Sequence, residues 1–99
     1  MLKDDDAKDK LMAEIFKALA HEYRIKMLRI IISSEKPLHI KALAEMLNLN
    51  YEVVYKHIKI LEKAGIIGIF MVGRSRVPYV KRREELSKLL EDLVNINKQ

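Results

Sequence analysis

Cysteine is absent from the sequence, and glutamine occurs only once, as Gln99. Without cysteine the chain has no disulfides, no thiolate metal ligands and no cysteine nucleophile. Glutamine is thermolabile, and the chain is rich in isoleucine, lysine and glutamate, so this composition favours a thermophilic source.

Long apolar runs are also missing, since the longest candidates are residues 30–32 and 64–72. Neither run is long enough to span a membrane. The acidic first six residues lack the apolar core of a signal peptide, so we expect a cytoplasmic protein with no membrane partner. A length of 99 residues, half of them hydrophobic and a third charged, predicts one globular domain over residues 1–99.

Residue patterns that would indicate catalysis are lacking too. The chain has no glycine-rich phosphate loop, and its four serines have no nearby histidine with an acidic partner. Glu84 and Glu85 could mimic a carboxylate pair, but adjacent helix residues point in different directions. A zinc site needs several converging ligands, whereas the histidines lie on three separate segments. We predict no enzyme, no metal site and no cofactor, and polar or helix-capping roles for His21, His39 and His57.

The charge of the chain is unevenly distributed. The net charge is +5, and residues 66–83 carry five basic and no acidic side chains. A basic block without compensating acids is typical of a nucleic-acid footprint. The alternative is a solvated, charged hairpin.

Two helices are predicted in the first third of the chain. One begins near Asp6, with three aspartates at its positive end and an apolar stripe at residues 11, 12, 15, 16 and 19. The other spans residues 21–32, with residues 25, 28, 31 and 32 facing inward, and is broken by residues 33–37.

A helix-turn-helix unit is predicted next. Ile40, Leu43, Ala44 and Leu47 give a short amphipathic helix. Residues 48–50 form a turn, and the side-chain oxygen of Asn50 is expected to cap a further helix. That helix buries residues 54, 58 and 61 and ends at Gly65, which suits a left-handed cap. Two short helices joined by a tight turn match the helix-turn-helix motif.

The pattern then changes from helix to strand. Residues 66–72 are β-branched or aromatic and predict a strand, residues 73–76 a hairpin tip, and residues 77–80 a return strand at a sheet edge because of Pro78. A last helix carries residues 86, 89, 90, 93 and 94 on one face. The predicted fold is mainly α (α+β), in the order helix-helix-helix-helix-hairpin-helix.

Three segments, in the right order, resemble ArsR-type winged helix-turn-helix regulators. Residues 18–28 are similar to the junction of their first two helices, residues 54–65 to the end of their recognition helix, and residues 72–79 to their wing. The resemblance covers roughly residues 12–82; small archaeal and viral winged-helix proteins share parts of it. It implies a symmetric dimer on double-stranded DNA, with the fourth helix in the major groove and the hairpin on the backbone or minor groove. Residues 38–41 lack cysteine and residues 83–99 lack histidine, so metal sensing is not implied.

The candidate DNA contacts lie on the fourth helix and the hairpin. Basic, tyrosyl and acidic side chains can meet phosphates or base edges, and arginine at a wing suits phosphate or a narrow minor groove. An ordinary polar helix face and a solvated loop are the alternatives, and residues 81–83 extend the basic patch or charge the strand end. The candidates are Asn50, Tyr51, Glu52, Tyr55, Lys56, Lys59, Arg74, Ser75 and Arg76.

The first and last helices are the candidate dimer interface, because two apolar terminal stripes on a small domain suit burial between chains. We predict a homodimeric, sequence-specific regulator, a repressor, with no effector identified. The alternatives are a sequence-tolerant architectural DNA-binding protein and a winged-helix protein-interaction module. The predicted interface residues are Leu11, Ile15, Leu86, Leu89, Leu90 and Leu93.

Overall fold

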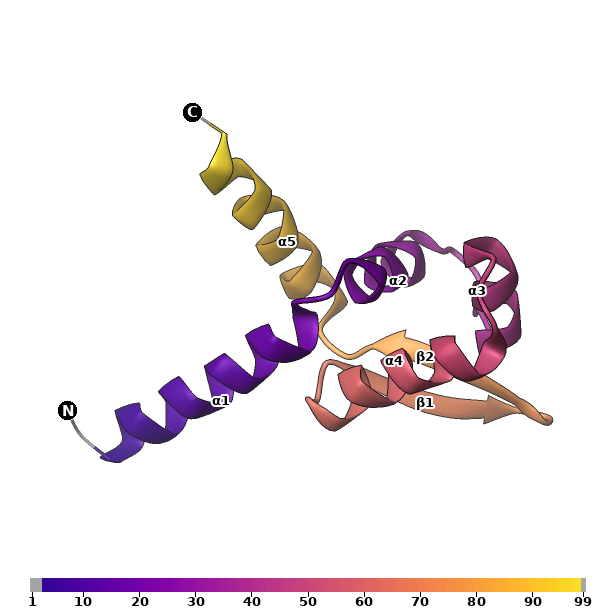
Figure 1. Cartoon of the computed structure of the whole chain (residues 1–99), viewed down its shortest axis with the longest axis horizontal. Helices are drawn as coiled ribbons and strands as arrows, with labels where there is room; N and C mark the ends of the chain where they lie inside the picture. The colour runs from indigo at the N-terminus through magenta and orange to yellow at the C-terminus, as the bar shows by residue number, and fades with distance from the viewer. Residues whose placement is uncertain (1–2, 99) are drawn as a thin grey trace.

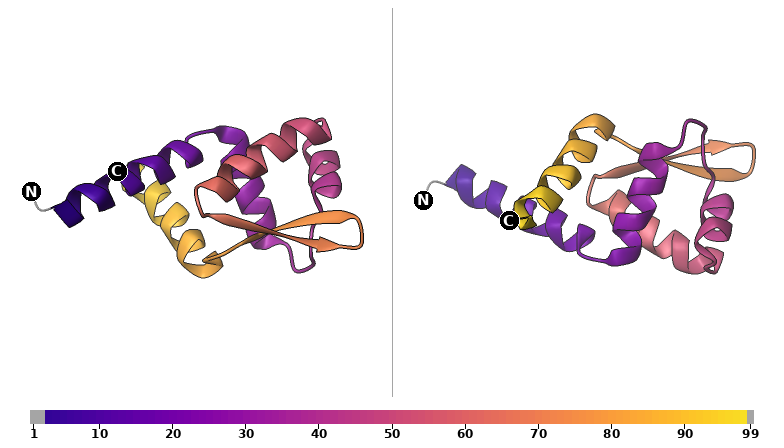
Figure 2. Two further views of the ribbon diagram at one scale, coloured as in Figure 1. Left: turned by 90° about the horizontal axis from the view of Figure 1, so that it is seen from below. Right: turned by 90° about the horizontal axis from the view of Figure 1, so that it is seen from above.

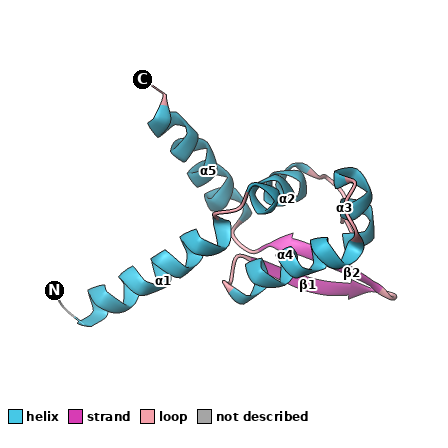
Figure 3. Cartoon of the chain, viewed as in Figure 1, coloured by secondary structure: helices cyan, strands magenta, loops and turns pink. Residues whose placement is uncertain are grey.

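The computed structural model describes residues 3–98, so Met1, Leu2 and Gln99 lie outside the described residues. The order of elements agrees with the prediction, and the fold is mainly helical with one antiparallel hairpin (Figure 3). None of the helices within residues 3–98 has the length and hydrophobicity needed to cross a membrane. The elements are α1 (Lys3–Leu19), α2 (Glu22–Ser33), α3 (Ile40–Leu47), α4 (Tyr51–Lys63), β1 (Ile67–Val72), β2 (Ser75–Val80) and α5 (Arg83–Asn97).

Two parts of the molecule are distinguished by their packing (Figure 1). The body consists of α2, α3, α4 and the hairpin, whereas the arms, α1 and α5, diverge from it in a wide V. Figure 2 shows the two chain ends on one side of the molecule and the tip of the hairpin on the other. The tip of the hairpin and α3 therefore lie at the end of the molecule that is remote from the arms.

The core fills the body. Apolar residues at helical spacing on α3 and α4 are buried, as the sequence predicts, and form one cluster with residues of α2 and β1. Met27 was not among the predicted inward residues of α2, yet it is completely buried. α2 is covered on more than one side, so its buried face is wider than the predicted stripe. The largest fully buried side chains are Met27, Leu28, Ile40, Leu43, Val54, Ile58, Leu61 and Ile67.

Two histidines begin helices of the body. His21 Nδ1 accepts from the Tyr23 backbone N–H at 3.1 Å and caps α2. His39 Nδ1 accepts from the Ala42 backbone N–H, also at 3.1 Å, and caps α3. These bonds satisfy donors that the first turn of a helix leaves unpaired. The predicted capping role of both residues is confirmed.

Asn50 occupies the N-cap position of α4, but its side chain makes no capping hydrogen bond, so the predicted bond is wrong. The preceding turn is closed by the backbone instead. Asn48 adopts a left-handed conformation, with φ of 54°, and its N–H donates to the carbonyls of Ala44 and Glu45. Asparagine tolerates this conformation better than most residues. The first helix also differs from the prediction, because it begins at Lys3 and not near Asp6 and includes the aspartates in its first turn.

The hairpin turn is shorter than predicted. Val72 pairs with Ser75 and Met71 with Arg76, so only Gly73 and Arg74 form the turn. Gly73 has φ of 59°, and a first turn residue with positive φ matches the twist of two-residue hairpins. Ser75 and Arg76 therefore belong to β2 and not to the tip. Strand β1 begins at Ile67, one residue later than predicted.

Candidate nucleic-acid interface

Three predicted side chains of α4 and one of β2 meet on a single surface. Tyr51, Tyr55 and Lys59 lie four residues apart and share one face of α4. The rings of Tyr51 and Tyr55 stack at 6.1 Å between centroids, and Lys59 Nζ lies 6.0 Å from the Tyr55 centroid. Arg76 Nη1 donates to Tyr51 Oη at 3.1 Å, and its guanidinium lies 4.8 Å from the Tyr55 centroid. We call these four residues the tyrosine–arginine cluster.

The cations of the cluster are held by polar partners. The hydrogen bond to Tyr51 raises the pKa of Arg76 above its ordinary value. Lys59 Nζ pairs with Glu62 Oε1 at 2.5 Å, and this hydrogen bond raises the pKa of Lys59. Both groups therefore stay charged at neutral pH and remain at the surface.

The other predicted contact residues lie around the cluster without joining it. Asn50, Glu52 and Lys56 are exposed on or before α4. Arg74 is exposed in the hairpin turn, and Ser75 is exposed at the start of β2. The nine predicted residues thus lie on or directly before α4 and in the hairpin, and the structure brings four of them into contact.

Sequence reasoning missed a second cluster, which joins α4 to the junction of α1 and α2. Arg24 Nε donates to His57 Nδ1 at 3.1 Å, and Arg24 Nη1 donates to the Ala18 carbonyl at 3.0 Å. The His21 and His57 rings lie 4.5 Å apart between centroids. Burial, the charge of His21 and then that of Arg24 lower the pKa of His57. Arg24 is the arginine of the ArsR-like segment, and this was the one signal that could have drawn attention to it.

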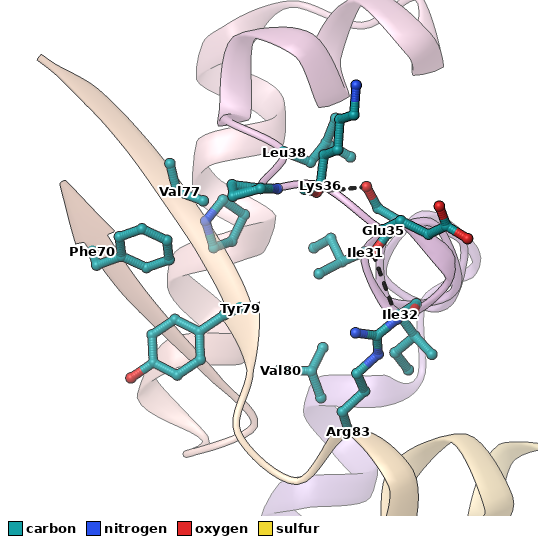
Figure 4. Close-up of a pocket in the computed structure, with 13 residues that line it drawn as sticks. Ile31, Ile32, Glu35, Lys36, Leu38, Phe70, Val77, Tyr79, Val80 and Arg83 are labelled. Carbon is teal, nitrogen blue, oxygen red and sulfur yellow. Dashed lines mark hydrogen bonds between the residues drawn. The ribbon is translucent and has the colours of Figure 1, made fainter. Parts of the chain in front are cut away.

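The basic block of residues 66–83 is divided by the fold. Arg82, the N-cap residue of α5, pairs through Nε with Glu85 in the first turn of that helix. Arg83 Nη2 donates to the Ile32 carbonyl and lies 3.5 Å from the Ser34 carbonyl, at the C-terminal end of α2. A cation there suits the negative end of the helix. Figure 4 shows Arg83 at one edge of a hollow of about 320 Å³ between α2 and β2. Arg82 therefore pairs at the start of α5 and Arg83 joins α5 to the end of α2, which leaves Arg74 and Arg76 as the arginines of the candidate interface.

The described residues, 3–98, contain no cluster of side chains suited to a metal ion. Within residues 3–98, no three histidine, cysteine or carboxylate side chains converge to hold a metal ion. His21, His39 and His57 instead accept hydrogen bonds through Nδ1.

A sequence model described as "HTH domain" matches residues 24–75, just over half of the chain. The chain belongs to the HTH domain family. Comparison with curated proteins gives no match. The matched residues of this HTH protein run from Arg24 to the first residue of β2 and contain the tyrosines of the cluster.

Solved structures extend the likeness to the whole chain. The HTH protein is similar to a homodimeric winged helix-turn-helix DNA-binding domain from Mycobacterium bovis, described as a possible ArsR-family regulator. The TM-score is 0.84 at 17% identity, covering 100% of this chain and 92% of that one. NolR from Sinorhizobium fredii gives 0.80 at 15% identity, covering 98% and 94%. Reduced HlyU from Vibrio cholerae gives 0.76 at 18% identity, covering 99% and 100%. The predicted winged helix-turn-helix fold is thereby confirmed, and ArsR-type proteins are among its structural neighbours.

Proposed function

We propose that two copies of this HTH protein bind double-stranded DNA sequence-specifically and regulate transcription, as a repressor. In this proposal α4 enters the major groove, and the hairpin contacts the backbone or the minor groove. The observation that carries the proposal is the tyrosine–arginine cluster, in which half-buried tyrosines of the second helix of the helix-turn-helix unit meet an exposed arginine of the wing. Recognition helices of this motif read base edges in the major groove.

The charge of the surface supports this partner. Arg74, Arg76, Lys56 and Lys59 are all exposed, two on the hairpin and two on α4. Neutralisation of phosphates by such groups releases counterions and makes affinity fall steeply with salt. The tyrosines add hydroxyls and ring faces that bond to bases and phosphates. This combination suits a polyanion with readable edges better than it suits an apolar protein partner.

The arms support the second copy. In α5 no residue is buried, and Leu89 and Leu93 remain 41% and 37% exposed. In α1, Leu11 is 56% exposed and Ile15 half-buried. Leu86 and Leu90 are also half-buried. Apolar faces on two projecting helices are typical of an interface between chains. The Mycobacterium bovis domain is described as homodimeric, which is consistent with this arrangement.

The test is selection of bound sequences from random duplex DNA, followed by titration of the selected duplex and a scrambled one. A repressor of this kind enriches a palindrome whose half-sites lie about one helical turn apart, roughly 34–36 Å. Equal affinity for both duplexes would indicate an architectural protein instead. The absence of duplex binding at low salt would indicate a protein-interaction module.

A further inference from the structure

The two arginines of the hairpin have the same charge and lie two residues apart, but their surroundings differ. Arg74 is exposed in the turn. Arg76 lies in β2, where it pairs with Met71, and its side chain reaches α4. Among the contacts of residues 3–98, only Arg76 of the two joins the hairpin to α4.

The contact with α4 fixes the position of the Arg76 guanidinium and leaves N–H donors for a ligand. Arginine carries five N–H donors in a planar fork. Among the hydrogen bonds of residues 3–98, only Nη1 of Arg76 donates, to Tyr51 Oη, and the Tyr55 ring centroid lies 4.8 Å from the guanidinium. Tyr51 accepts this bond through oxygen, so its own O–H remains a donor. The remaining arginine N–H groups and the Tyr51 hydroxyl are available to a ligand from the exposed side.

The position of the Arg76 guanidinium favours a base edge over a phosphate as its ligand. Tyr51 and Tyr55 belong to the first two turns of α4, and the N-terminal residues of a recognition helix are the ones that meet base edges. Guanine presents O6 and N7 side by side in the major groove, and this pair of acceptors fits the arginine fork. A phosphate would fit the fork as well, but it needs no orientation by two tyrosines from another element.

We propose that Arg76 is a specificity-determining residue that reads a guanine in the major groove, oriented by Tyr51 and Tyr55. This inference rests on the proposed function, because it assigns a base to one residue of the same interface. It places one hairpin side chain, that of Arg76, beside α4 in the major groove, while the rest of the hairpin keeps its contact with the backbone or the minor groove. It also replaces the prediction from the sequence, in which Arg74 and Arg76 had the same role at the hairpin tip. Arg74 keeps the role of a phosphate contact that is indifferent to sequence.

The experiment compares Arg76→Ala with the matched control Arg74→Ala, on the duplex selected from the random pool and on its scrambled form. Both variants lose one exposed positive charge, so both bind the scrambled duplex more weakly. Only Arg76→Ala is expected to lower the ratio of selected to scrambled affinity, by at least about fivefold, the lower limit for loss of a good arginine–guanine pair. An equal ratio for the two variants would overturn the inference.

Three further measurements separate reading from positioning. Arg76→Lys keeps the charge but not the fork, so the ratio is expected to fall as in Arg76→Ala. Replacing the contacted guanine with 7-deazaguanine should weaken wild-type binding and leave Arg76→Ala unaffected. Tyr51→Phe should lower the ratio in the wild type more than in Arg76→Ala, because part of the role of Tyr51 is to hold Arg76. A ratio retained by Arg76→Lys, or equal sensitivity of wild type and Arg76→Ala to 7-deazaguanine, would contradict guanine reading.

Failure of this inference differs from failure of the proposed function. A wild-type protein that binds selected and scrambled duplexes equally overturns the proposed function, and the inference with it. A wild-type protein that discriminates, with an Arg76→Ala variant that discriminates equally well, overturns only the inference. Circular dichroism of each variant checks the fold, which should be unchanged because Arg76 is exposed.

Discussion

The body and the arms use the same residue types in opposite ways. In the body, leucine, isoleucine and valine side chains are completely buried, as at Leu61, Ile58 and Val54. In the arms, similar residues lie in the open, with Leu11 at 56% and Val94 at 59% exposure. Only the C-terminal end of α1 is buried, through Ala18 and Leu19. Within residues 3–98, most of the apolar face of each arm is therefore left uncovered by its own chain.

The body and the arms therefore contribute to different free energies, that of folding and that of association between chains. A buried side chain of the body contributes to the folding of each chain, whereas an exposed apolar side chain of the arms contributes once a second copy covers it. An isolated helix is marginally stable in water, and tertiary contacts of its apolar face provide most of its stability. We therefore expect the body to depend on its own packing and the arms to depend on protein concentration.

The largest effect is expected from truncation in the body. Leu61→Ala removes a fully buried side chain from the centre of the core and should cost about 2–5 kcal/mol of unfolding free energy. Leu89 on α5 is 41% exposed in the single chain, so Leu89→Ala should destabilise the protein less. Its effect should become smaller on dilution, because it depends on the second copy. Urea unfolding at several protein concentrations measures both. A Leu89→Ala effect that matched Leu61→Ala at every concentration would erase the distinction.

A charge on the arm should act on assembly instead of folding. Leu89→Glu is expected to yield monomers and to weaken DNA binding, because isologous pairing buries each interface residue against the second copy. Lys88→Glu is the control, since it adds a glutamate at the neighbouring, solvated position and breaks only the exposed pair with Asp92. Analytical ultracentrifugation at micromolar concentration should show dimers for the wild type and Lys88→Glu. A monomeric wild type would refute the dimer.

The body was largely predictable from spacing, because each of its helices repeats apolar residues with one period and ends at a recognisable residue. Gly65 is an example: its φ of 81° is the left-handed cap that the sequence predicts. The period does not show how many sides of a helix are covered, and this is why the burial of Met27 was missed. The dimer interface of the arms remains a prediction, since the structure contains one chain.

The candidate site was predictable in its residues but not in its contacts. Tyr51 and Tyr55 share a face by helical spacing, and the sequence alone shows it. Arg76 was misplaced because residues 73–76 were all assigned to the turn, whereas only Gly73 and Arg74 form it and Arg76 pairs with Met71 in the strand ladder. Arg24 and His57 lie 33 residues apart, and no local pattern connects positions so distant.

A smaller effect distinguishes the starts of the two helices of the helix-turn-helix unit. His39 accepts a capping hydrogen bond in α3, whereas Asn50 makes none in α4. His39→Ala should therefore cost about 0.5–1.5 kcal/mol of unfolding free energy, the usual net value of one hydrogen bond. Asn50→Ala should cost less. Thermal unfolding of the two variants checks this order, and the reverse order would mean that Asn50 has a partner in solution.

The smallest expected effect concerns the contact between α1 and the body, and it appears as a dependence on pH. Arg24 joins the Ala18 carbonyl at the end of α1 to His57 on α4. Burial and the neighbouring His21 and Arg24 hold the pKa of His57 below its ordinary value of 6.5. The unfolded chain therefore binds a proton that the native chain resists, so this contribution to stability is complete above about pH 6.5.

As the pH falls below 6.5, the unfolded state is protonated first, and stability decreases until the lower native pKa of His57 is passed. The reference variant is His57→Asn, whose side-chain oxygen can still accept from Arg24 but does not titrate. Both proteins retain His21 and His39, so the difference between their unfolding free energies reports the titration of His57 together with its coupling to His21. Urea unfolding between neutral and mildly acidic pH should give a steeper loss for the wild type. If unfolding free energy fell equally with pH in the wild type and in His57→Asn, the titration of His57 would not affect stability. The contact between α1 and the body would then be independent of pH.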